Sequence, residues 1–173
     1  MSPPLGAHMP IGGGLYKAVE RIMRLQGTAL QVFTKNQRQW RVPELKREDV
    51  RSFLRVREEW GPHPLAAHDS YLINLAGPDP EITRRSIALF ATEIVRAARL
   101  HIPFVVTHPG AHRGLGKERG LENQIRNLDT ALDLGLEQAR ACGVDWDGMV
   151  LLETTAGQGT VLGGSFEELA AII

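Results

Sequence analysis

The chain has 173 residues, with 20 Lys+Arg against 20 Asp+Glu, and 43% of its residues are hydrophobic. These proportions are typical of one folded globular domain, and they exclude a disordered chain, a collagen-like chain and a general electrostatic attraction to nucleic acid or membrane. No apolar run approaches the roughly 20 residues that span a bilayer, and the N-terminus has no signal-peptide pattern. We therefore expect a cytoplasmic protein that does not contact membranes.

Cysteine usage agrees with this assignment. The single cysteine, Cys142, excludes an internal disulfide and a multi-cysteine zinc cluster, and it favours a reducing compartment. It lies near the end of an expected helix, where we predict an inert, packed thiol.

Short apolar runs alternate along the chain with longer stretches of helical periodicity. In chain order we expect a strand at Leu5–His8, a helix at Leu15–Leu25, a strand at Ala29–Phe33, a helix at Lys46–Trp60, a strand at Leu65–His68, a helix that opens at Asp79-Pro80, a strand at Phe104–His108, a helix at Leu121–Ala141, a strand at Met149–Glu153 and a last helix capped by Ser165. Runs without in/out alternation are typical of strands that are buried on both faces. The alternation predicts an α/β fold with a parallel sheet, either a doubly wound open sheet or a barrel.

Local signals support the helix ends. Pro80 occupies a first helical position, where its missing N–H costs nothing, and Gly61-Pro62 stops the preceding helix. Ser165 and Glu168 have the spacing of a capping box.

Metal-capable side chains stand at the carboxyl ends of four expected strands: His8, His68, His108 and Glu153. One such residue is more often a packing residue, but four at matching positions favour a (β/α)8 barrel, whose reacting groups gather at that face. Two imidazoles and a carboxylate form a zinc-binding set that leaves a position open for water, as in hydrolytic sites.

Five blocks of sequence resemble one known family. They are Leu5–His8 with Gly12–Gly14, Phe33–Arg41, His68–Leu75, His108–His112 and Leu152–Gly159. In these blocks, which occur in the family's order over nearly the whole chain, the protein resembles endonuclease IV, the zinc-dependent apurinic/apyrimidinic endonucleases of DNA repair.

The resemblance implies a TIM (β/α)8 barrel of the xylose-isomerase-like type, with three zinc ions in a complete enzyme. By resemblance, His68 and His108 are ligands of one zinc, and Glu153 is both a catalytic residue and a bridge to a second zinc. The implied reaction is hydrolysis of the phosphodiester bond 5′ to an abasic site by zinc-activated hydroxide, which leaves a 3′-hydroxyl. The implied partner is double-stranded DNA that contains abasic sites, and the complete enzyme is expected to be a monomer.

Two loops carry the residues that the resemblance assigns to DNA binding. Arg38 and Gln39 enter the duplex, Tyr71 and Leu72 wedge against exposed bases, and such wedging stabilises a bent, unstacked duplex. Lys35 suits a phosphate, and Asn36 and His8 contact phosphate or support a ligand.

The family is longer than this chain, so we expect residues 1–173 to form an incomplete TIM-barrel domain with about five β/α units and without strands 6–8. On this expectation the chain alone is marginally stable, prone to aggregate and inactive. Two alternatives remain open at this stage. One is a metal-dependent sugar isomerase or epimerase of a related barrel, and the other is a non-catalytic remnant that still binds DNA.

Overall fold

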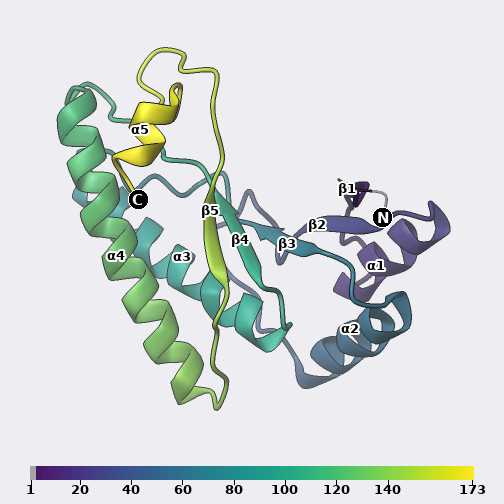
Figure 1. Ribbon diagram of the computed structural model, residues 1–173. Coiled ribbons are helices and arrows are strands. Elements are labelled where there is room, and N and C mark those ends of the chain that lie inside the picture. Colours follow the sequence, from purple (N-terminus) through teal and green to yellow (C-terminus); the bar gives the residue numbers. More distant parts are fainter. Residues whose placement is uncertain (1–2) are drawn as a thin grey trace.

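The computed structural model describes residues 3–173 and confirms the alternation of strands and helices (Figure 1). In chain order the elements are β1 (Gly6–His8), α1 (Leu15–Arg24), β2 (Ala29–Phe33), α2 (Arg47–Trp60), β3 (Leu65–His68), α3 (Pro80–Arg99), β4 (Phe104–Thr107), α4 (Lys117–Ala141), β5 (Met149–Leu152) and α5 (Phe166–Ala170).

All five strands form one parallel sheet in the order β1-β2-β3-β4-β5. Each strand pairs with the next one in sequence, so that Leu30 lies opposite Leu65 and Ala67 lies opposite Val105. This unreversed order is that of a barrel wall, since a doubly wound sheet reverses its strand order at a switch point. Right-handed crossovers then place the helices on one face of the sheet, and the carboxyl ends of all the strands meet at one edge, the carboxyl edge.

The hydrophobic core lies between the sheet and the helices. Helices α1 and α2 pack together on one part of the sheet, and α3 packs along α4 on the other (Figure 1). The large side chains of Phe53 on α2 and Phe90 on α3 are completely buried. Burial of one such side chain stabilises the fold by about 1.5–3 kcal/mol, which explains why the apolar stripes of these helices face the strands.

A glycine sets the distance between α3 and α4. A Cβ at Gly135 would lie 2.8 Å from Cβ of Ile94 and 3.0 Å from the carbonyl oxygen of Ala91. The absence of a side chain therefore lets the two helix backbones approach closely.

The starts and caps of the helices follow the sequence closely, with two differences. The carboxylate of Asp79 caps α3 by accepting hydrogen bonds from the backbone N–H groups of Glu81 and Ile82. Helix α4 begins at Lys117 rather than Leu121, because its first turn is made of charged residues that carry no apolar periodicity.

The second difference concerns the capping box of α5. The hydroxyl of Ser165 accepts from the backbone N–H of Glu168 at 3.4 Å, as expected. The carboxylate of Glu168 instead accepts from the N–H groups of Gly163 and Gly164 and pairs with Lys117. The Lys117 ammonium holds the pKa of the Glu168 carboxyl below its usual range, and this contact ties the start of α4 to α5.

Two edges of the described sheet are open, because β1 and β5 each pair on one side only. All three residues of β1 are exposed, and so are Leu5 and Met149 beside these edges.

Cys142 directly follows α4 and is also exposed, so the prediction of a packed thiol is wrong. Within residues 3–173, no helix combines the length and the apolar character that are needed to cross a membrane.

Candidate metal centre

The carboxyl ends of three neighbouring strands bring two imidazoles and one carboxylate together. His68 ends β3, His108 follows β4 and Glu153 follows β5. The sheet register extends to the last of them, because the N–H of Glu153 donates to the carbonyl of Thr107 at 2.9 Å. One ligand atom from each of the three side chains lies within 4.8 Å of the others. Nitrogen and oxygen donors at this separation fit around one metal ion.

The orientation of His68 supports a cation at this position. Its Nδ1 lies 3.0 Å from the carbonyl oxygen of Asp69, and its Nε2 lies 3.2 Å from Oε2 of Glu153. Assigning the proton of the neutral ring to Nδ1, where it can be donated to that carbonyl, leaves the lone pair of Nε2 facing a carboxylate oxygen. Two acceptor atoms repel each other unless a proton or a cation lies between them. A metal ion shared by His68 and Glu153 removes this conflict.

His108 supplies an independent observation. Its ring centroid lies 5.2 Å from that of His68, and its Nδ1 is buried without a hydrogen-bond partner in residues 3–173. An unpartnered buried polar atom costs about 1–3 kcal/mol, so this nitrogen also favours an added group at the site. The three residues therefore fit the metal ion that the sequence predicts.

Asp69 lies behind this group and touches His68. Its carboxylate is buried 3.5 Å from Nδ1 of His68, and Thr107 donates to its other oxygen at 2.6 Å. Burial raises the pKa of the Asp69 carboxyl well above its usual range, although the hydrogen bond from Thr107 acts in the opposite direction. Such contacts behind a metal-binding histidine fix the orientation of its ring.

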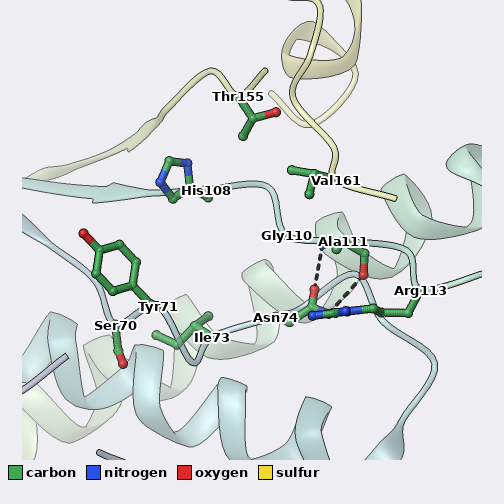
Figure 2. Close-up of a pocket in the computed structure, with 10 residues that line it drawn as sticks. All are labelled: Ser70, Tyr71, Ile73, Asn74, His108, Gly110, Ala111, Arg113, Thr155 and Val161. Atoms are coloured by element: carbon green, nitrogen blue, oxygen red, sulfur yellow. Dashed lines mark hydrogen bonds between the residues drawn. The ribbon is translucent and has the colours of Figure 1, made fainter. Parts of the chain in front are cut away.

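A pocket of about 290 Å³ adjoins His108 at the carboxyl edge, between the loops that follow β3, β4 and β5 (Figure 2). It is lined by Ser70, Tyr71, Ile73, Asn74, His108, Gly110, Ala111, Arg113, Thr155 and Val161. The amide of Asn74 joins the first two loops, because it donates to the carbonyl of Ala111 at 3.0 Å and accepts from the N–H of Ala111 at 2.9 Å. Figure 2 shows Tyr71 and His108 at the same end of this pocket.

Most of the residues predicted to contact DNA lie in loops beside this pocket. Arg38 and Gln39 are exposed, and the backbone N–H of Arg38 donates to the side-chain oxygen of Asn36 at 2.9 Å. Tyr71 is 60% exposed and packs edge-on against Phe33, with 5.4 Å between the ring centroids. Leu72, beside Tyr71, is partly buried. An exposed aromatic ring supported from behind is suited to stacking, but contact with DNA stays a prediction.

Lys35 does not lie where a phosphate contact requires it. Its side chain is only 1% exposed, and its Nζ lies 2.9 Å from Oε1 of Glu93 on α3. The predicted role of Lys35 does not fit this position. A buried carboxylate on a later helix binds its ammonium group, and the sequence of the loop alone does not reveal that partner.

His8 lies apart from the three metal-capable residues. Its Nδ1 lies 2.8 Å from Oε1 of Gln31, and its ring packs against Phe33 at 4.4 Å between centroids. His8 is exposed on β1, so a contact with DNA stays a prediction for this residue.

Asp69, Ser70 and Asn74 had no predicted role in the site. All three belong to the polar block after β3, and each makes hydrogen bonds that organise the carboxyl edge. Their position directly after a strand that ends in His68 was the available signal, because the loops after barrel strands surround the site.

Comparison with known proteins defines the class of this fold and site. Residues 16–173 match the model of a family described as "Xylose isomerase-like TIM barrel". The chain therefore belongs to the xylose isomerase-like TIM barrel family, and the five-stranded sheet is a partial barrel of this type.

Within that family the chain resembles endonuclease IV. It is 46% identical over 170 residues to "Probable endonuclease 4" of Chloroflexus aurantiacus, a match that covers 98% of this chain and 57% of that protein. It is 50% identical over 169 residues to the protein of the same name from Oleidesulfovibrio alaskensis, with 98% and 55% of the two chains covered.

Solved structures give the same result. Endonuclease IV from Thermus thermophilus superposes with a TM-score of 0.80 at 37% identity, over 98% of this chain and 58% of that one. A D-tagatose 3-epimerase-like protein superposes with a TM-score of 0.70 at 16% identity, which shows a shared fold alone. These matches confirm the resemblance to endonuclease IV. The chain spans a little more than half the length of these relatives.

Proposed function

We propose that this chain forms part of a DNA-repair endonuclease that hydrolyses the phosphodiester bond 5′ to an abasic site and leaves a 3′-hydroxyl. The observation that carries the proposal is the convergence of His68, His108 and Glu153 on one point. The identity to endonuclease IV proteins over 98% of the chain supports the choice of substrate.

In this proposal His68, His108 and Glu153 would hold one zinc ion, and Glu153 would also contribute to a second. When bound, zinc supplies an acidified water as the nucleophile and positive charge for the departing 3′ oxygen. Asp69 and the carbonyl beside it keep the Nε2 lone pair of His68 directed toward the ion. Glu153 is exposed at the carboxyl edge, where it can contact both the ion and the phosphate of a DNA strand.

In this proposal the side chains of the loops after β2 and β3 contact the DNA. Arg38 and Gln39 enter the duplex, while Tyr71 and Leu72 wedge against the bases beside the gap. The pocket that has Tyr71 and His108 at one end then receives the sugar and phosphate of the abasic nucleotide, which carries no base.

Zinc content and strand cleavage test this proposal together. Because the chain spans about 57% of a relative's length, cleavage is measured on a chimera. In it, residues 1–173 replace the matching part of Thermus thermophilus endonuclease IV. We expect cleavage of a duplex with one abasic site on its 5′ side, and extension of the product by a DNA polymerase, which requires a 3′-hydroxyl.

Two variants identify the residues responsible. His108→Ala should abolish zinc retention by the chain and lower cleavage by the chimera by at least about 100-fold, since one of three ligands to the ion is lost. His63→Ala is the matched control, because this histidine lies before β3 at the opposite edge of the sheet. A folded chimera that retains zinc and leaves abasic DNA intact would contradict the proposal, and so would turnover of a ketose without DNA binding.

A further inference from the structure

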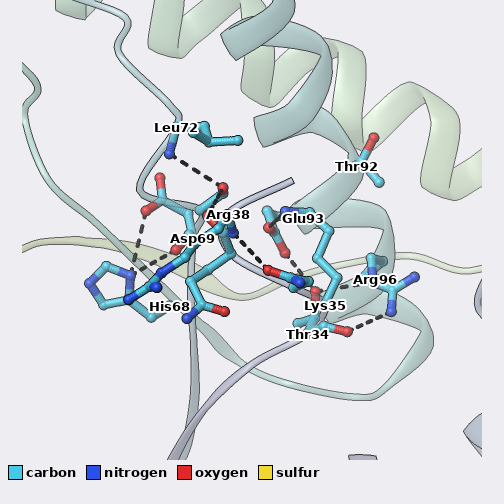
Figure 3. A network of polar contacts seen from close by, with 12 residues as sticks. Thr34, Lys35, Arg38, His68, Asp69, Leu72, Thr92, Glu93 and Arg96 are labelled. Atoms are coloured by element: carbon cyan, nitrogen blue, oxygen red, sulfur yellow. Dashed lines mark hydrogen bonds and ion pairs between the residues drawn. The ribbon is translucent and has the colours of Figure 1, made fainter. Parts of the chain in front are cut away.

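Four polar side chains are buried behind the loop that joins β2 to α2. The ammonium of Lys35 pairs with Oε1 of Glu93 at 2.9 Å, and both side chains are at most 2% exposed. The hydroxyl of Thr34 donates to the other carboxylate oxygen of Glu93 at 2.6 Å. Both oxygens of a carboxylate on α3 are thus occupied by the first two residues of the loop (Figure 3).

Arg96, one helical turn beyond Glu93, holds the same loop at a second point. Its guanidinium donates to the hydroxyl and to the carbonyl of Thr34, and also to the carbonyl of Pro43 at 3.1 Å. Helix α3 therefore fixes both the beginning and the far part of a loop that includes Arg38 and Gln39.

The loop after β2 is joined to the loop after β3, which is the second loop that contacts DNA in the proposed function. The hydroxyl of Ser70 donates to the carbonyl of Gln37 at 2.7 Å, and the N–H of Leu72 lies 3.4 Å from the same hydroxyl. Gln37 directly precedes Arg38, and Ser70 directly precedes Tyr71. A displacement of the first loop would therefore move the side chains of the second.

Burying these charges is costly, and such an ion pair often stabilises a fold no better than apolar residues of similar size. The Nζ of Lys35 has no hydrogen bond of good geometry in residues 3–173, and within these residues the Glu93 carboxylate is its ion-pair partner. What the pair does supply is one defined position for the loop.

We propose that Glu93 is a positioning residue for lesion recognition, acting through Lys35 and Thr34 on the loop that carries Arg38. This inference rests on the proposed function, and it adds a residue that cannot itself touch DNA, because it is 2% exposed.

Glu93→Gln tests the proposal. The variant keeps the size of the side chain and an acceptor for Thr34, but it removes the carboxylate that forms the ion pair with the Lys35 ammonium. We expect the dissociation constant for abasic duplex, and the KM of the chimera, to rise by about tenfold, in line with the effects of residues that act through others. Zinc content and kcat at saturating DNA should stay within about twofold.

A second variant and a control separate positioning from general damage to the fold. Adding Lys35→Met removes the stranded charge, so the double variant should regain stability and part of the DNA affinity, which a double-mutant cycle measures. Thr92→Ala is the control, since Thr92 neighbours Glu93 on α3 but is only partly buried, and its hydroxyl donates to the carbonyl of Ala88 on its own helix. Loss of zinc and of folded protein with unchanged affinity of the folded fraction would overturn the proposal.

Limited trypsin digestion gives a readout that does not depend on DNA. Cleavage after Arg38 and Arg41 should be at least about fivefold faster in Glu93→Gln than in the wild type, because the loop samples open states more often. If the wild type does not bind abasic duplex, the proposed function fails. Faster trypsin cleavage of Glu93→Gln would still support the role of Glu93 in positioning the loop after β2. Unchanged cleavage of Glu93→Gln would overturn positioning whatever the DNA result.

Discussion

At the scale of single residues, the site is built from atoms that lack complementary partners. Nε2 of His68 faces a carboxylate oxygen of Glu153, and Nδ1 of His108 is buried without a hydrogen bond. In contrast, the buried carboxylate of Asp69 has a close donor in Thr107. These unpartnered atoms distinguish a group of side chains that can bind an ion from a buried polar cluster whose atoms are all hydrogen-bonded.

Arg38 gives a prediction at this scale. Its side chain is exposed and has no described ion pair, so it is free to contact DNA. Arg38→Ala should weaken binding to abasic duplex by about tenfold, and the loss of one positive charge inside the duplex should reduce the salt dependence by about one unit of slope. Fluorescence anisotropy titrations at several salt concentrations measure both quantities.

The matched control for Arg38 is Arg140→Ala. Arg140 is also exposed, but it lies in the last turn of α4, away from the carboxyl edge. If both variants bind abasic duplex as the wild type does, the loop after β2 is not a DNA contact.

The three metal-capable residues were predictable because their position depends only on topology. Parallel strands end at one edge, so side chains at those ends become neighbours however far apart they are in sequence. The position of Lys35 was not predictable, because it depends on a side-chain pairing with Glu93 that no local pattern encodes. The position of Asp69 and Ser70 directly after β3 was a signal for the site, but their hydrogen bonds to other elements were not predictable from local patterns.

At the scale of elements, helix packing sets a constraint that helix propensity does not reveal. Strand ranges and most helix ranges followed from the sequence to within one residue, since apolar runs and capping residues are local signals. The close approach of α3 to α4 at Gly135 depends on two helices at once.

Gly135→Ala tests this constraint. Alanine gains about 1 kcal/mol of helix propensity over glycine. Its Cβ would meet Cβ of Ile94 at 2.8 Å and backbone atoms of Ala91, neither of which can rotate away. Overpacking costs about 1–3 kcal/mol, so we expect a net loss of stability. Chemical denaturation measures it.

Asp133→Ala provides the comparison on the same helix. Asp133 is exposed, and alanine there gains propensity without a clash, so the variant should be at least as stable as the wild type. A stability gain in Gly135→Ala of the same size would show that the helices separate without cost.

At the scale of the whole molecule, the sheet is an open arc. Leu5 is 79% exposed beside β1 and Met149 is 59% exposed on β5, and each edge strand presents unpaired backbone groups. Exposed edges with apolar side chains promote pairing with other chains. The same edges are where further barrel strands would pair.

We therefore expect the 173-residue chain, produced alone, to self-associate. Sedimentation velocity should show a weight-average mass that rises with concentration. Leu5→Lys with Met149→Lys should reduce the association, because charged edge residues oppose pairing. Leu25→Lys is the control, as Leu25 is 67% exposed but follows a helix. A single monomeric species at every concentration would contradict this expectation.

The exposed Cys142 has a practical consequence. It is the chain's only cysteine, and it lies between the end of α4 and the start of β5, at the edge of the sheet opposite to the metal-capable residues. Maleimide chemistry can therefore attach one fluorophore or one surface linker per molecule. A molecule anchored there holds its carboxyl edge toward the solution, so that the proposed binding of DNA can be tested on single molecules.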